Sequence, residues 1–421
     1  MSHSSHQGSH RHHDRGSDNV NHTHGHGCGH SSKSDKVHHR VGGWVPNDHT
    51  VVERYISEVL DKIKQDKRPL DQLHPTVVEF EHLIDKTPAL RMGFIEMLEQ
   101  VPNKPPYNKN PALEPQIRDY ETVFRAFDYI ITHSVPFQDN QFVALPISAI
   151  LDWPMGTDVG LATLLVPTVN AQFKKMFNAW AEYLSSPASR EYLTTNEDGW
   201  FGPKASEHIS NFVDTYVCDP SAEHYGFKSW DDFFTRKFRE GARPIEFPSD
   251  DDIINNACEW SVSKIAENVK EYDRFWLKSE PYSLRDTLND DPYTDQFVGG
   301  AIYQAFLSAY KYHRWASPAY INALAARAII WIKSNNLTLG MIGFIGVGMN
   351  EVSTREVTVK PGDRVNKGDE LGMFHFGGST HCLVFRRGVN INFDDWYSSP
   401  DPEVLLNAAI ATVGEGRRIY H

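Results

Sequence analysis

The most informative run of residues in this chain is Leu371-Gly372-Met373-Phe374-His375-Phe376-Gly377-Gly378-Ser379-Thr380, close to the C-terminus. Alternating apolar residues predict strands over Glu356–Lys360 and Asp369–Phe376, and the Pro361-Gly362-Asp363 sequence between them suits a tight turn. The paired glycines before Ser379 permit a strained, closely approached backbone. Because Gly-Gly-Ser-Thr is also an ordinary turn sequence in β proteins, the tetrapeptide alone leaves a reactive serine and a simple turn both open.

The bulk composition is that of a protein with a sizeable core. The chain has 421 residues, which exceeds one typical domain, and its formal net charge is −13 with both signs mixed along the sequence. Such a balance argues against a nucleic-acid surface. No apolar run reaches membrane-spanning length, no signal-peptide core is present, and the four cysteines have neither disulfide nor zinc spacing. We therefore expect a cytoplasmic protein with no membrane span and no nucleic-acid partner.

Residues 1–42 form a His-rich tail, in which 11 of the 21 histidines precede Val41. We expect this tail to be disordered, because it has too little apolar surface to offset the entropy of ordering. The run from His22 to His30 could chelate a divalent metal ion. We favour a solvated tail that binds metal only incidentally, and we assign no metal site.

Residues 43–200 are expected to form a helical N-terminal domain. Apolar residues with helical spacing predict four helices, over Asp48–Lys64, Thr76–Leu98, Ile117–Thr132 and Val169–Leu184. The last of these helices carries an apolar stripe that includes Phe173, Met176, Phe177, Trp180 and Leu184. A stripe with this spacing is typical of core packing rather than of a ligand pocket.

Residues 201–421 become β-rich after Ile253, so the fold class is predicted to be α+β. Leu339–Met349 is a strand candidate, and its glycine run from Gly343 lacks the order of a phosphate-binding loop, which favours a buried strand. The hairpin pattern around residue 361 also occurs in biotinyl and lipoyl carrier domains. Those domains carry a lysine at the hairpin tip between apolar neighbours, and this sequence has none there.

Two further stretches carry a family resemblance. Asp231-Asp232-Phe233-Phe234-Thr235-Arg236-Lys237-Phe238-Arg239-Glu240-Gly241-Ala242-Arg243-Pro244-Ile245 reads by itself as a helix end, a glycine turn and an extended segment. With Tyr312-His313-Arg314-Trp315 and the 371–380 run, it resembles the pyruvoyl-dependent phosphatidylserine decarboxylase family over about residues 225–387. The helical N-terminal region fits the fungal, soluble branch of that family, which includes the L-tryptophan decarboxylase of psilocybin biosynthesis. The resemblance implies a catalytic domain over residues 201–421.

The resemblance also implies a protein that makes its own prosthetic group. The hydroxyl of Ser379 would attack the carbonyl of Gly378, and β-elimination with loss of ammonia would leave a pyruvoyl group on the α chain, residues 379–421. The β chain would end at residue 378. Decarboxylation of an amino acid leaves electrons that no ordinary side chain absorbs, whereas a carbonyl condensed with the substrate amine as a Schiff base takes them up. The implied activity is that of a carboxy-lyase that matures from a zymogen.

A serine nucleophile needs a base and an orienting acid. The resemblance places Glu259 at the acid position and assigns His313 to proton transfer around the decarboxylation step; from its neighbours alone, Glu259 is equally a solvated carboxylate at a strand end. The second family histidine is missing, because Ala316 stands in its place. A second departure follows Pro318, where the sequence reaches the Ala-Arg strand at Arg327 almost at once, so that a segment of the β core is absent.

Three hypotheses remain open. In the first, the chain is an active decarboxylase in which His375 or His381 replaces the missing base, and Phe374, His375 and Phe376 line the substrate pocket. In the second, it is an unprocessed, inactive family member, and in the third the His-rich tail buffers metal. A soluble amino acid is the favoured substrate, because the chain has no membrane span and no evident basic amphipathic helix for a lipid surface. An aromatic amino acid such as L-tryptophan is what the resemblance implies. Phosphatidylserine, decarboxylated to phosphatidylethanolamine, is the alternative.

Overall fold

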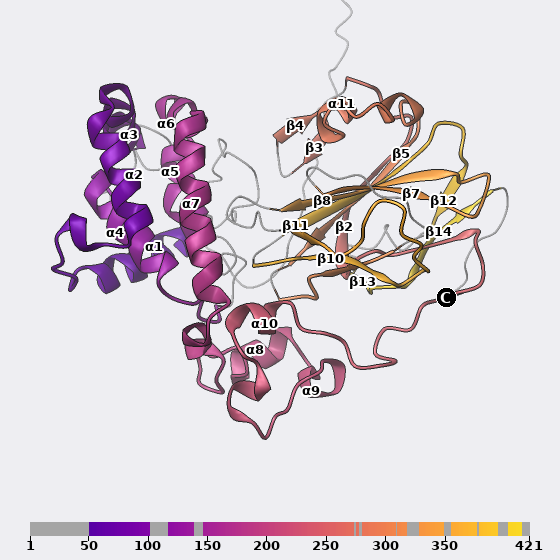
Figure 1. Ribbon diagram of the computed structural model, residues 1–421, viewed down its shortest axis with the longest axis horizontal. Helices are drawn as coiled ribbons and strands as arrows, with labels where there is room; N and C mark the ends of the chain where they lie inside the picture. Colours follow the sequence, from indigo (N-terminus) through magenta and orange to yellow (C-terminus); the bar gives the residue numbers. More distant parts are fainter. Residues whose placement is uncertain are drawn as a thin grey trace, which may run out of the picture. The chain divides into compact units, whose positions relative to one another are not determined.

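The computed structural model (Figure 1) describes the backbone of residues 50–101, 117–138, 146–272, 275–277, 280–308, 310–317, 328–348, 355–376, 379–394 and 403–414. The long helices lie in the N-terminal part of this sequence and the strands in the C-terminal part, which confirms the α+β class. The His-rich tail and Gly378 lie outside the described residues. Within the described part, no helix has the length and apolar character that crossing a bilayer requires.

The longer helices are α1 (Thr50–Ile63), α2 (Pro75–Lys86), α3 (Pro88–Gln100), α4 (Tyr120–Ile131), α5 (Pro146–Met155), α6 (Asp158–Leu164) and α7 (Pro167–Leu184). Three of the four expected helices appear as α1, α4 and α7. The single helix expected over Thr76–Leu98 is wrong, because the chain breaks into α2 and α3 at Thr87, whose ψ is 96°. Pro88 causes the break, since the residue before a proline avoids helical geometry, and the same proline then begins α3.

Aromatic rings form the core of these helices. Phe80 of α2 lies at 6.0 Å from Phe94 of α3, at 5.4 Å from Phe124 of α4 and at 5.0 Å from Phe173 of α7, measured between ring centroids. All three contacts are edge-to-face, the arrangement that the ring quadrupoles favour. The apolar stripe of α7 is therefore core, as expected, and Trp180 at its C-terminal end is fully buried.

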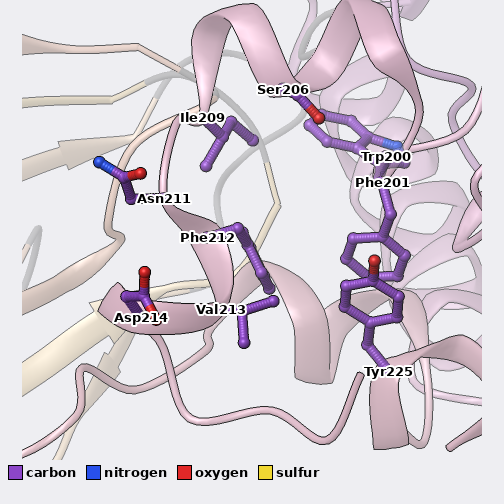
Figure 2. Close-up of a pocket in the computed structure, with 9 residues that line it drawn as sticks. All are labelled: Trp200, Phe201, Ser206, Ile209, Asn211, Phe212, Val213, Asp214 and Tyr225. Carbon is purple, nitrogen blue, oxygen red and sulfur yellow. The ribbon is translucent and has the colours of Figure 1, made fainter. Parts of the chain in front are cut away.

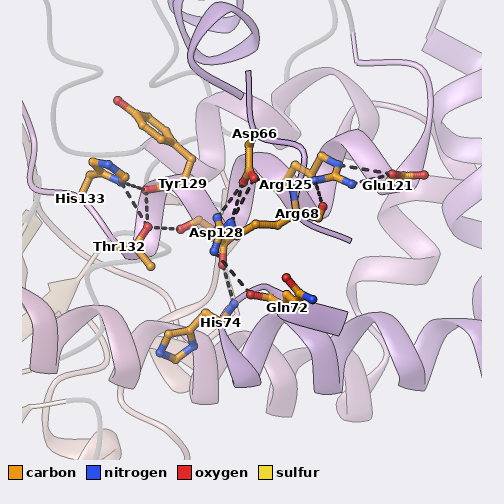
Figure 3. A network of polar contacts seen from close by, with 10 residues as sticks. All are labelled: Asp66, Arg68, Gln72, His74, Glu121, Arg125, Asp128, Tyr129, Thr132 and His133. Atoms are coloured by element: carbon orange, nitrogen blue, oxygen red, sulfur yellow. Dashed lines mark hydrogen bonds and ion pairs between the residues drawn. The ribbon is translucent and has the colours of Figure 1, made fainter. Parts of the chain in front are cut away.

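A buried carboxylate ties α4 to the chain that precedes α2 (Figure 3). Asp128 is 1% exposed and accepts hydrogen bonds from Nη2 of Arg68 at 2.7 Å and from the backbone N–H of His74 at 2.6 Å. The same guanidinium binds Asp66, and this hydrogen bond holds the pKa of that carboxyl below its usual value. Charge-assisted bonds of this kind are about twice as strong as neutral ones, so the network fixes the first turn of α2.

Short helices occur both before and after residue 200. They are η1 (Leu70–Gln72), η5 (Pro187–Tyr192), α8 (Pro203–His208), α9 (Phe212–Thr215), η6 (Glu223–Gly226), α10 (Trp230–Phe234), α11 (Leu284–Thr287) and η7 (Thr294–Gln296). Ser229 caps α10, because its hydroxyl accepts a hydrogen bond from the backbone N–H of Asp232. The expected domain boundary at residue 200 stays a prediction.

The strands of the described ranges form four sheets. The largest has the order β13-β2-β5-β11-β8-β7 and is antiparallel throughout. Its strands are β13 (Glu403–Val404), β2 (Trp260–Ala266), β5 (Ala301–Leu307), β11 (Ser379–Phe385), β8 (Met341–Gly348) and β7 (Ile329–Lys333). The smaller sheets are β6 (Arg314–Ala316) with β10 (Glu370–Phe374) and β9 (Arg355–Val357), β1 (Ile253–Asn255) with β14 (Ala409–Val413) and β12 (Ile391–Phe393), and β3 (Phe275–Leu277) with β4 (Glu280–Tyr282).

The β6-β10-β9 sheet packs on the large sheet through two rings. Trp315 and Phe374 lie 4.6 Å apart, and a side chain at Gly346 of β8 would meet both of them at 3.3–3.4 Å. The glycine run of β8 is thus a buried strand that other side chains approach closely, as expected. The strand expected over Asp369–Phe376 is wrong at its C-terminal end, because β10 stops at Phe374 and the next two residues turn away.

Candidate active site

Three stretches that are far apart in the sequence meet at α10. The ring of Phe376, from the 371–380 run, lies 4.9 Å from Trp230 and 6.1 Å from Phe234. The ring of His313, from the Tyr-His-Arg stretch, lies 3.8 Å from Phe234. The residues that carry the family resemblance therefore form one contiguous cluster, which the sequence could only imply.

Ser379 is the first residue of β11, at the centre of the large sheet. Its backbone pairs with Leu307 of β5 on one side and with Gly348 of β8 on the other. Gly377 and Gly378 lie outside the described residues. The expected nucleophile is thus anchored by strands on both sides immediately after the expected point of cleavage.

Phe376 precedes the two glycines and has an unusual backbone. Its φ is +50°, in the left-handed region that a bulky residue rarely adopts. The ring is 6% exposed and makes an edge-to-face contact with Trp180 at 4.4 Å. Because such a conformation costs about 1–3 kcal/mol, it persists only where the surroundings enforce it, and the aromatic contacts do so here.

His313 follows β5 and precedes β6 in the sequence, and its side chain is fully buried. Its Nδ1 lies 2.9 Å from the carbonyl oxygen of Lys311, and its own carbonyl accepts from the backbone N–H of Phe374 at 2.9 Å. A carbonyl oxygen can only accept, so Nδ1 carries the proton and Nε2 is the basic nitrogen of the neutral ring. This tautomer suits proton transfer at Nε2.

Arg236 supports the chain that leads to His313. Its guanidinium is 3% exposed, and Nη2 donates to the carbonyl oxygens of Tyr310 at 2.7 Å and Lys311 at 3.2 Å. The cation also lies 4.4 Å from the ring centre of Tyr216. The stretch that begins at Asp231 therefore holds the Tyr-His-Arg stretch in place.

Glu259 lies one residue before β2 and is 3% exposed. Both of its carboxylate oxygens accept from Arg243, at 2.9 Å from Nε and 2.8 Å from Nη2. The register of β2 and β11 against Phe306 of β5 places Glu259 and Ser379 at the same end of the large sheet. The interpretation of Glu259 as a solvated carboxylate is wrong, because the structure buries it in an ion pair; its role as orienting acid stays a prediction.

Ala316 occupies a buried position and supplies no base. It is 3% exposed, and its backbone N–H donates to the carbonyl oxygen of Ala257 at 2.9 Å. Its position is thus two residues from Glu259 along the neighbouring chain. The position at which the resemblance led us to expect a second histidine therefore holds only a methyl group.

The two substitute bases have contrasting surroundings. His375 places Nδ1 at 3.0 Å from both carboxylate oxygens of Asp231 and Nε2 at 3.1 Å from Glu356. Burial opposes protonation, but the hydrogen bonds and charges of Asp231 and Glu356 outweigh it and raise the pKa of His375. His381 is fully buried between the rings of Phe344 and Tyr303, and burial lowers its pKa to about 3.

The residues predicted to line the substrate pocket lie in two different places. Phe374 is fully buried between the two sheets, whereas His375 and Phe376 belong to the α10 cluster. Their role in a substrate pocket stays a prediction. Sequence reasoning missed Glu356 and Arg243 as partners, because no local pattern signals which charges a tertiary fold will pair.

Two cavities in the described part lie elsewhere. One, of about 220 Å³, lies among short helices and is lined by residues that include Phe201, Asn211, Asp214 and Tyr225 (Figure 2). The other, of about 310 Å³, adjoins the Asp128 network. Neither is lined by a predicted site residue. Among the described residues, no group of three His, Cys, Asp or Glu side chains is arranged to hold a metal ion.

Comparisons with known proteins point to the same family as the motif stretches that form the α10 cluster. Sequence models of phosphatidylserine decarboxylase match residues 74–209 and, in two segments, residues 230–329 and 320–410. The second match divides into two segments near Arg327, and the absence of a core segment there stays a prediction. The matches include all three motif stretches.

Curated relatives extend the comparison. The decarboxylase iboD of Amanita muscaria is 39% identical over 325 residues, covering 64% of this chain and 91% of its own length. The L-tryptophan decarboxylase of Psilocybe cubensis is 29% identical over 429 residues, covering 88% of this chain and 94% of its own. Phosphatidylserine decarboxylase proenzyme 3 of Schizosaccharomyces pombe is 28% identical over 194 residues, which cover 40% of this chain and 20% of its own length. The chain belongs to the phosphatidylserine decarboxylase family, a family of pyruvoyl-dependent carboxy-lyases.

Proposed function

We propose that the chain cleaves itself between Gly378 and Ser379, carries a pyruvoyl group derived from Ser379, and decarboxylates an aromatic amino acid such as L-tryptophan. The observation that carries the proposal is the anchoring of Ser379 in β11, three residues after the strained Phe376. The substrate class is supported by the relative named L-tryptophan decarboxylase, which matches most of this chain. Phosphatidylserine remains the alternative substrate, because the proenzyme from Schizosaccharomyces pombe shares the catalytic region.

The proposed maturation consumes one water molecule and releases one molecule of ammonia. The hydroxyl oxygen of Ser379 bonds to the carbonyl carbon of Gly378, its proton leaves to a base, and the peptide nitrogen takes up a proton as its bond breaks. Elimination across the resulting ester frees the carboxylate of Gly378 and leaves a dehydroalanine, whose hydrolysis consumes water and releases ammonia. The anchored backbone around Ser379 suits this sequence of steps, whereas Ala316 provides no acceptor for the first proton.

A pyruvoyl carbonyl supplies the electron sink for decarboxylation. The described residues around it have separate tasks. Nε2 of His313 can take up or deliver a proton, because Lys311 fixes the tautomer through Nδ1. The buried rings of Trp230 and Phe376 exclude water from this end of the sheet.

A second candidate is an unprocessed family member. It is favoured by Ala316 and by the engagement of both Glu259 oxygens with Arg243, which together leave the expected acid without a histidine to orient.

The intact mass of the freshly purified full-length chain distinguishes the two candidates. We expect two fragments that separate between Gly378 and Ser379, the smaller one beginning with pyruvoyl, and a single chain for Ser379→Ala. Incubation of the cleaved protein with L-tryptophan or with phosphatidylserine vesicles then identifies the substrate by the amine formed. An uncleaved wild type that an Ala316→His substitution converts to fragments would support the second candidate.

A further inference from the structure

His375 joins three elements at the point where the chain leaves β10. Its ring accounts for the end of the strand, since Nδ1 faces the Asp231 carboxylate on α10 and Nε2 faces Glu356 on β9. Ionised carboxylates only accept hydrogen bonds, so both ring nitrogens donate when the ring is an imidazolium, the state that the raised pKa of His375 favours. A protonated ring has no lone pair with which to accept a proton, so these surroundings disfavour His375 as the substitute base for Ser379.

The next residue is held by a different kind of contact. Phe376 has a φ of +50° and inserts its ring between Trp180 of α7 and Trp230 of α10. Phe374, by contrast, is still paired in β10, and Ser379 is already paired in β11. The connection between the two sheets therefore starts from a residue whose backbone conformation is imposed by neighbouring side chains.

We propose that Asp231, His375 and Glu356 form an ionic clamp that, together with the aromatic lock on Phe376, positions the backbone leading to Ser379 for self-cleavage. His375 is thus a positioning residue, not a base. The proposal rests on the self-cleavage proposed above. It assigns a role to Asp231 and Glu356, whose sequence positions gave no sign of one.

The pH dependence separates a clamp from a base. The charged groups that face His375 are Asp231 from α10 and Glu356 from β9, while Arg314 of the adjacent β6 is paired with Glu370 at 2.8 Å. A clamp needs the imidazolium, so the cleavage rate should fall as pH rises through the pKa of His375. A base needs the neutral ring, so the rate would instead rise over the same range.

The test follows cleavage of the full-length chain by intact mass after synthesis, from pH 5.5 to 8.5. We expect His375→Gln and Asp231→Asn to slow cleavage about 10- to 100-fold, as small misplacements of reacting groups do. Glu356→Gln should slow it less, because that side chain is 55% exposed. His82→Gln, at an exposed histidine, is the matched control and should cleave like the wild type. Urea midpoints identify any variant that is slow only because it is unfolded, and Glu356→Gln is the mild variant that should remain folded.

Three results would overturn the proposal, and they have distinguishable meanings. Unchanged cleavage in all three folded clamp variants, or a rate that rises with pH and depends on His375, refutes the positioning role alone. A wild-type chain that stays intact at every pH refutes the proposed self-cleavage and the positioning role with it. An independent readout is the NMR titration of His375 in the Ser379→Ala protein, where Asp231→Asn should lower the pKa of the ring.

Discussion

The ion pair between Arg243 and Glu259 should be measurable as a coupling free energy. Glu259 has a side chain that is 4% exposed and Arg243 one that is 18% exposed, and two hydrogen bonds join them. Removing one partner of a buried pair leaves the other charge uncompensated, which typically costs about 3–5 kcal/mol. The cost of Glu259→Leu should be about 3 kcal/mol, at the lower end of this range, because Arg243 keeps some solvent contact and its stacking on Phe238.

Arg243→Met should cost more, about 4 kcal/mol, since the carboxylate it abandons is the more deeply buried group. The double variant removes both charges and replaces them with apolar groups, so its stability should lie within about 1 kcal/mol of the wild type. The difference between the summed single effects and the double effect is the coupling, which should be about 4 kcal/mol or more.

The assay is urea denaturation of all four proteins, followed by far-UV circular dichroism at pH 7. A coupling below about 0.5 kcal/mol, the range of independent sites, would refute the structural role of the pair. Glu259→Gln separates that role from catalysis: a large loss of stability with normal cleavage of the folded fraction marks a structural carboxylate. Normal stability with abolished cleavage would mark an orienting acid.

Three further predictions follow from the buried polar groups. Burial lowers the pKa of His381 to about 3, so as the pH falls this histidine is protonated in the unfolded chain before it is protonated in the folded chain. The free energy of unfolding should therefore fall by about 2 kcal/mol between pH 7.5 and pH 5. His381→Leu should remove this part of the urea midpoint's pH dependence, whereas His82→Gln should not. Asp128→Ala should lower the free energy of unfolding by about 2–3 kcal/mol, because it leaves the backbone N–H of His74 without its acceptor and removes one of the two carboxylates that bind Arg68. Asp61→Ala at an exposed ion pair should cost under about 0.5 kcal/mol in the same urea titration. Arg236→Lys should cost about 2 kcal/mol in that titration, because a lysine cannot reproduce the planar fork in which Nη1 reaches Phe233 while Nη2 reaches Tyr310 and Lys311. An unchanged midpoint would show that the fork is dispensable.

Much of the fold could be predicted from local patterns. Helical spacing predicts α1, α4 and α7, and the alternation and turn residues around Pro361 predict the antiparallel pairing of β9 with β10. The errors fall at particular residues. Helical spacing alone predicts one helix over Thr76–Leu98, whereas Pro88 ends α2 and begins α3. The alternation predicts a strand two residues longer than β10 at its C-terminal end, because the aromatic contacts that bend Phe376 come from α7 and α10.

The sequence by itself determined the family, the helical or β-rich character of each half of the chain, and the residues that deserve testing. It could do so because periodicity, turn chemistry and motif order are local properties of the chain. Only the tertiary structure decided the partners of those residues. Arg243 is 16 positions from Glu259, and Asp231 is 144 positions from His375. Which charges meet depends on how sheets and helices pack, and that packing sets whether a histidine lies among carboxylates as an imidazolium or among rings as a neutral base.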